Sequence, residues 1–157
     1  MQITTYFLAA IVSFSGLLLG MLLAKLAPEE QKPGTKYFVF LKKLLFFLII
    51  SFFLFFYNNG MAFLLILLLL LTLFLLFNGK FDLIKFLEKY YLAYLILGFI
   101  FFYSSKITNL FIIESVLIFL YGIPAASLAF NVKKKNYIDI FINAVFFVPI
   151  IGLYLLL

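Results

Sequence analysis

The sequence predicts an all-α integral membrane protein, a six-transmembrane-helix bundle with both termini outside. Of the 157 residues, 68% are hydrophobic and only 11% are charged, whereas a soluble domain is roughly half apolar and about a quarter charged. The apolar residues form long uninterrupted runs and do not alternate with polar residues, as the strands of a membrane β-barrel do. Helices are therefore predicted, and a soluble globular enzyme, a disordered chain and a coiled coil are excluded.

Six apolar runs match the length that crosses the hydrocarbon core of a bilayer, which is about 20 residues per helix. They predict helices over residues 3–26, 37–57, 61–77, 81–103, 109–130 and 137–157, within a single membrane domain that spans residues 1–157. The first run follows no basic segment, so we expect a retained span and not a signal peptide. Pro33 and Gly34 precede the second run, and we expect the chain to turn back there.

The remaining links are short. Asn58-Asn59-Gly60 predicts a tight connection before the third run, and Asn78-Gly79 after it is typical of a helix end. The third run carries almost only large apolar side chains, so we expect its helix to face lipid.

The distribution of lysine predicts the orientation. All 12 basic residues are lysines, and eleven of them lie in or beside the connections after the first, third and fifth helices: Lys25, Lys32, Lys36, Lys42, Lys43, Lys80, Lys85, Lys89, Lys133, Lys134 and Lys135. Only Lys106 lies in a connection on the opposite side. Because lysine marks the cytoplasmic side of membrane proteins, we expect a multi-pass protein of the cell membrane whose lysine-bearing connections are cytoplasmic.

Composition also narrows the chemistry. The chain has no cysteine and no histidine, so disulfides, thiolate nucleophiles, iron–sulfur clusters and the usual zinc sites are excluded, and we expect no metal and no cofactor. The net charge of +6 comes from lysines spread between apolar runs, which suits anionic lipid headgroups and not nucleic acid. The expected partners are membrane lipids, together with other membrane subunits or further copies of the chain.

The first run carries a stripe of small residues. Ser13, Gly16, Gly20 and Ala24 share one helix face, and the spacing of Gly16 and Gly20 allows two helices to approach closely. Two interpretations stay open, which are a docking face for another subunit and packing inside the same bundle.

Glu114 is the one acidic residue with apolar runs on both sides. It follows Asn109 by five residues, so it should lie about 8 Å from the outer end of its helix. An ionisable group inside a membrane is costly and is a candidate functional residue by default. We expect a proton or cation carrier, a substrate contact, or a structural residue that pairs with Lys106 or accepts a hydrogen bond from Tyr154.

The fifth and sixth runs each contain a proline in mid-membrane, Pro124 and Pro149. Proline removes a helix hydrogen bond and bends the helix, and a freed carbonyl can coordinate an ion or a substrate. Asn143 precedes Pro149 by about one and a half turns. These residues predict either plain structural kinks or a site between the last two helices.

Two polar segments lie on the predicted inner side. Pro28, Glu29 and Glu30 are typical of a helix start within either a connecting turn or a partner-docking loop. The run Lys133-Lys134-Lys135 is first a topology signal and second a contact for lipid headgroups or a partner.

Three hypotheses for function follow. The first is a non-catalytic subunit or scaffold of a membrane complex, which would dock through Gly16 and Gly20 and the inner loops. The second is a small transporter or channel with a site around Glu114 between the last two helices. The third is a lipid-processing enzyme that would use Asp139 and Asn143 with Glu29 or Glu30. We expect no catalytic site.

Overall fold

The computed structural model describes residues 3–57, 92–130 and 141–155, and every element within these ranges is helical. The elements are α1 (Ile3–Leu26), α2 (Pro28–Tyr57), α5 (Leu92–Ser104), α6 (Thr108–Ala129), the short 3₁₀ helix η1 (Ile142–Phe146) and α8 (Phe147–Leu155). The all-α prediction is confirmed for this part of the chain. The helix predicted over residues 61–77 and the first half of the one predicted over residues 81–103 lie outside it.

Three helices are long and apolar enough to cross a membrane. They cover Ile3–Leu26, Pro33–Tyr57 and Thr108–Ala129, and shorter apolar helices cover Leu92–Ser104 and Ile142–Leu155. By their length and composition these helices indicate a membrane protein. The predicted boundaries at residues 3–26 and 109–130 agree with α1 and α6 to within one residue.

Helix α6 lies at the centre of the described bundle and packs on α1, α2 and α5. It runs parallel to α1, because successive α1 positions meet successive α6 positions: the Ser13 Oγ donates to the Ser115 carbonyl at 3.0 Å, and Gly20 lies against the Ile123 carbonyl. The rings of Phe101 and Phe111, at 4.9 Å, set α5 antiparallel to α6 across the short turn that joins them.

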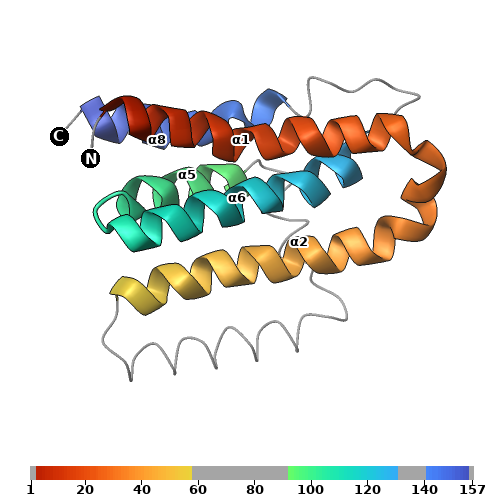
Figure 1. The fold of residues 1–157 in the computed structure, drawn as a ribbon, viewed down its shortest axis with the longest axis horizontal. Coiled ribbons are helices and arrows are strands. Elements are labelled where there is room, and N and C mark those ends of the chain that lie inside the picture. Colours follow the sequence, from red (N-terminus) through yellow and green to blue (C-terminus); the bar gives the residue numbers. More distant parts are fainter. Residues whose placement is uncertain (1–2, 58–91, 131–140, 156–157) are drawn as a thin grey trace.

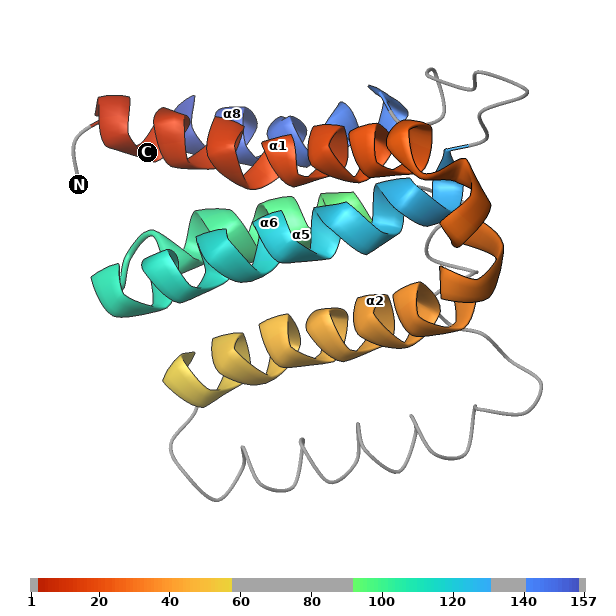
Figure 2. The same ribbon diagram turned by 45° about the vertical axis from the view of Figure 1, so that its right-hand side comes forward.

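One end of the bundle holds that turn, at Ser105–Ile107, and both ends of the described chain (Figure 1). We call it the turn end. Tyr6 near the start of α1 stacks on Tyr154 near the end of α8, with ring centroids 5.2 Å apart. The opposite end holds the link between α1 and α2 at Ala27 (Figure 2).

Helix α2 begins at Pro28, so the prediction of a turn at Pro33-Gly34 and a helix start at residue 37 was wrong. Proline suits the first position of a helix, and Glu29 in the first turn suits the helix dipole. The helix continues through Pro33, and its first turns cross the end of the bundle before its long part runs back antiparallel to α1 (Figure 1). The reversal is made inside a bent helix and not in a loop.

The last predicted helix is less regular than expected. Within residues 141–155 a 3₁₀ segment, Ile142–Phe146, precedes α8. Pro149 cannot donate to the carbonyl four residues earlier, and its ring crowds that carbonyl, which accounts for the tighter winding just before it. By contrast, α6 stays helical through Pro124.

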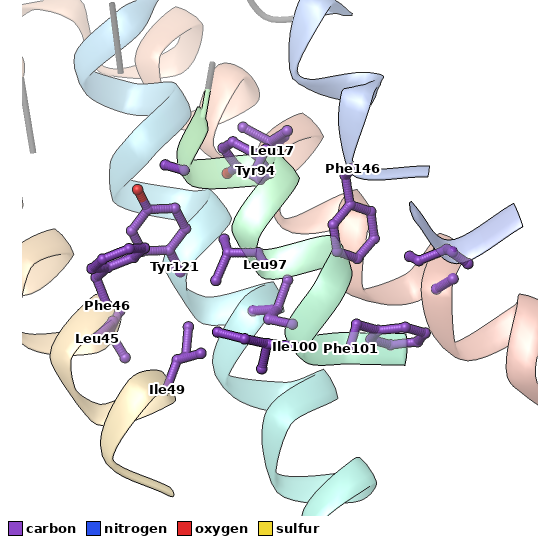
Figure 3. Packing of buried hydrophobic residues seen from close by; sticks show 14 of the residues in the cluster. Leu17, Leu45, Phe46, Ile49, Tyr94, Leu97, Ile100, Phe101, Tyr121 and Phe146 are labelled. Atoms are coloured by element: carbon purple, nitrogen blue, oxygen red, sulfur yellow. The ribbon is translucent and has the colours of Figure 1, made fainter. Parts of the chain in front are cut away.

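The core is apolar and rich in aromatic rings. Between α2, α5 and α6, the side chains of Phe46, Leu97, Tyr121 and Ile49 fill one shared space, which we call the three-helix junction (Figure 3). Phe46 and Tyr94 both contact Tyr121, with centroids 5.9 Å and 5.7 Å away. The order of residues along each helix therefore sets how far each core side chain lies from the turn end.

Candidate functional site

Glu114 is completely buried, with 0% of its surface exposed, and neither carboxyl oxygen has a hydrogen-bond partner among the described residues. It lies in the central helix α6, about 9 Å from its first residue, Thr108, at about 1.5 Å per residue. Burial of an ionised carboxyl without a partner is far more costly than burial of a neutral one. Glu114, which the sequence singles out as an acid within an apolar run, is therefore also unusual in the folded chain, as a buried acid without a hydrogen-bond partner among the described residues.

The neighbours of Glu114 on its own helix indicate which way it faces. Phe111, Ile118 and Tyr121 lie three residues before it and four and seven residues after it, so all share its face. Phe111 contacts Phe101 of α5, and Tyr121 contacts Phe46 of α2 as well as α5. Glu114 therefore faces the three-helix junction, and Phe111 on the same face also contacts Tyr6 of α1.

The two side chains predicted to contact Glu114 make contacts with other residues. The ammonium group of Lys106 lies over the ring of Tyr103, 5.3 Å from its centroid, and is exposed. The ring of Tyr154 packs on Tyr6 and Phe7. Because the Glu114 oxygens have no hydrogen-bond partner in the described chain, the predicted bonds from Lys106 and Tyr154 are wrong.

The predicted site between the last two helices is not assembled as expected. Helix α6, with Glu114 and Pro124, packs on α1, α2 and α5, whereas η1 and α8 pack mainly on α5. A Cβ atom at Gly98 of α5 would lie 2.6 Å from the Pro149 Cγ. Asn143 is half-buried in η1. Pro149 and Asn143 therefore belong to the α5 side of the bundle, while Glu114 belongs to the three-helix junction.

The small-residue stripe of α1 packs inside the chain. Gly16 lies against the backbone carbonyl of Phe119, and Gly20 against that of Ile123. Two serines add hydrogen bonds across this contact, from Ser13 to the Ser115 carbonyl and from Ser127 to the Gly20 carbonyl, each at 3.0 Å. Of the two interpretations, packing within the bundle describes this face.

The inner polar residues are only partly described. Glu29 is exposed in the first turn of α2, and Glu30 follows it in the same helix. Lys133, Lys134, Lys135 and Asp139 lie outside the described residues. No group of three or more histidine, cysteine or carboxylate side chains that could hold a metal ion occurs in the described ranges.

Sequence reasoning missed two buried hydroxyls. The oxygens of Tyr6 and Ser51 are buried and have no hydrogen-bond partner among the described residues. Tyr6 lies between the rings of Phe101, Phe111 and Tyr154, although its position near the end of a span predicts a headgroup contact. Ser51 follows the fully buried Ile49 by two residues, so it lies on the other side of α2 from the three-helix junction.

No known protein family, curated protein or solved structure matches the chain. Its function must therefore be argued from its own residues.

Proposed function

We propose that the protein is a small multi-pass transporter or channel of the cell membrane, in which Glu114 binds the transported species. The observation that carries the proposal is the complete burial of Glu114, without a hydrogen-bond partner in the described chain, in the most central helix. Acidic residues within membrane spans mark ion pathways and proton relays. A residue with a purely structural role would be expected to have a hydrogen-bond partner, because an unsatisfied buried polar group destabilises the fold.

The proposed topology has six spans with both termini outside and the lysine-bearing connections cytoplasmic. The parallel α1 and α6 and the antiparallel α5 support the alternation that six spans require. Glu114 would then lie in the outer half of the membrane.

A non-catalytic subunit of a membrane complex is the second candidate. Its support is the large apolar surface of α1 and α2, including Leu8, Ile11, Leu19 and Phe55. Lipid covers such a surface equally well, and the glycine face that was expected to dock a partner is occupied by α6. Transport is therefore the stronger proposal.

The test is flux in proteoliposomes with proton, sodium and potassium gradients applied in turn and read by an ion-sensitive dye. We expect the wild-type protein to carry one of these ions, and Glu114→Gln to reduce that flux at least about tenfold while remaining monodisperse and helical. Glu29→Gln is the matched control, because Glu29 is exposed, and it should keep wild-type flux. Unchanged flux in Glu114→Gln would remove this residue from the mechanism, and no flux in the wild type would favour the subunit.

A further inference from the structure

The surroundings of Glu114 restrict the ligand that it can bind. On its own helix the flanking positions of the same face are Leu110, Phe111 and Ile118, and Phe101 of α5 contacts Phe111. All four are apolar and buried. The carboxyl therefore lies among apolar side chains in the described part of the chain.

This environment fits a proton and does not fit a metal cation. Calcium takes about six to eight oxygen ligands, and magnesium requires a near-octahedral set. Among the described residues no group of three or more histidine, cysteine or carboxylate side chains could hold a metal ion, and neither Glu114 oxygen has a hydrogen-bond partner. A proton needs one oxygen atom and no further ligand.

No titratable group on the described parts of the packed helices is a hydrogen-bond partner of Glu114. Tyr94 of α5 and Tyr121 of α6 contact each other, and Lys42 and Lys43 lie beyond Phe46 on α2, further from the turn end. Tyr6 of α1 packs on Phe111, and Tyr57 of α2 donates to the Tyr103 carbonyl at 2.6 Å. None of these groups hydrogen-bonds Glu114.

Glu114 lies at unequal distances from the two ends of α6. Toward the turn end, the remaining helix is about 9 Å long, and the cover is the buried Leu110 together with the rings of Phe101, Phe111 and Tyr6, which contact one another. The Ser104 hydroxyl donates to the Phe101 carbonyl at 2.7 Å, and the Ser115 hydroxyl donates to the Phe111 carbonyl at 2.6 Å.

Toward the other end, α6 continues for about 22 Å to Ala129. Buried side chains follow one another there: Ile118 is 1% exposed, and the next residue on the same face, Tyr121, contacts Phe46 and Tyr94 (Figure 3). The path from Glu114 to the turn end is therefore the shorter one, about 9 Å against about 22 Å along α6.

From these two observations we infer that Glu114 binds a proton and exchanges it with the compartment at the turn end of the bundle. The inference rests on the proposed function, because it assigns the ligand and the side of access for the same residue. It predicts that Glu114 exchanges its proton faster with the compartment at the turn end than with the opposite compartment.

The experiment uses dicyclohexylcarbodiimide, an apolar reagent that adds to a protonated carboxyl group. Because the chain has no cysteine, the single variant Lys106→Cys marks the exposed turn end with one thiol. Proteoliposomes with different buffers inside and outside are treated with the carbodiimide and then with a membrane-impermeant biotin maleimide. After solubilisation, streptavidin separates molecules whose turn end faced outward from the others, and peptide mass spectrometry measures the Glu114 adduct in each pool.

We expect the adduct in the biotin-tagged pool to follow the outside pH and in the untagged pool the inside pH. Its yield should fall by up to about tenfold per pH unit on the alkaline side of the titration. A Glu114→Gln variant should lose this adduct, while Glu29→Gln should keep it. The inference is overturned if the tagged pool follows the inside pH, if neither pool responds to pH, or if Glu114 forms no adduct.

These outcomes are separate from those of the flux test. One-sided labelling together with normal flux in Glu114→Gln would overturn the transport function and leave the proton site standing. Loss of flux in Glu114→Gln together with two-sided labelling would overturn the inference and leave the transport function standing.

Discussion

Glu114 lowers the stability of the fold that contains it. A buried polar group without a hydrogen bond costs about 1–3 kcal/mol, and the apolar side chains around it offer no compensation. We expect Glu114→Leu, a replacement of similar volume, to raise the free energy of unfolding by about 1–3 kcal/mol while it abolishes flux. Unfolding of the detergent-solubilised protein by increasing fractions of dodecyl sulfate measures this change. A loss of stability would mean that the carboxyl has a stabilising partner.

The residue scale also shows what sequence reasoning can and cannot predict about a site. Glu114 stands out in the sequence because it is an acid inside an apolar run, and it is completely buried in the folded chain. The prediction that Lys106 and Tyr154 contact Glu114 was wrong. Residues at a similar depth along the bundle can point in different directions around their helix axes. The Lys106 ammonium group lies over the Tyr103 ring, and the Tyr154 ring stacks on Tyr6.

The contact between α1 and α6 is controlled by glycine. A Cβ atom at Gly16 would collide with the Phe119 carbonyl, whereas a Cβ atom at Gly152 of α8 would meet nothing within 4 Å. We expect Gly16→Ala to destabilise the protein by about 1–3 kcal/mol, because two backbones must separate. Gly152→Ala is the matched control, and it should be neutral or stabilise by up to about 1 kcal/mol. Titration of both variants with dodecyl sulfate measures their free energies of unfolding. Equal values for the two variants would contradict the close contact between α1 and α6.

The serines on the same contact have a smaller role. Ser127 donates across the helices to the Gly20 carbonyl, whereas Ser15 donates to the Val12 carbonyl of its own helix. Hydrogen bonds between membrane helices are worth about 0.6 kcal/mol on average. Ser127→Ala should therefore lower the unfolding free energy by about that amount in the same titration. Ser15→Ala should change it less, and the reverse order would show that the cross-helix bond is not formed.

Helix existence was easier to predict than helix connection. The apolar runs of α1 and α6 predicted their boundaries to within one residue, because hydrophobic length directly determines a span. The start of α2 was missed because Pro33-Gly34 usually signals a turn, and only the surrounding structure shows that the helix bends instead of ending. The neighbours of each helix were equally out of reach, since helices that are apolar all round carry no moment to orient them.

At the scale of the whole molecule, the start of α1, the α5–α6 turn and the end of α8 share one end (Figure 1). We expect membrane-impermeant maleimide to label Thr5→Cys and Lys106→Cys on intact cells, and to label Glu29→Cys only after the membrane is permeabilised. All three positions are exposed and the parent chain has no cysteine, so the signals carry no background. Labelling of Glu29→Cys on intact cells would contradict the lysine-based orientation.

The partnership of α1 with α6 has a consequence for biosynthesis. The hydrogen bond between Ser13 and Ser115 joins residues 102 positions apart, so the first helix enters the bilayer long before the ribosome has made its main partner. Until α6 is inserted, the small-residue stripe of α1 with Gly16 and Gly20 is exposed to lipid or to another helix with small side chains. A nascent chain arrested before Thr108 would therefore have a first helix that lacks its packing partner and exposes its helix-packing face. Insertion chaperones and membrane proteases recognise intermediates of this kind.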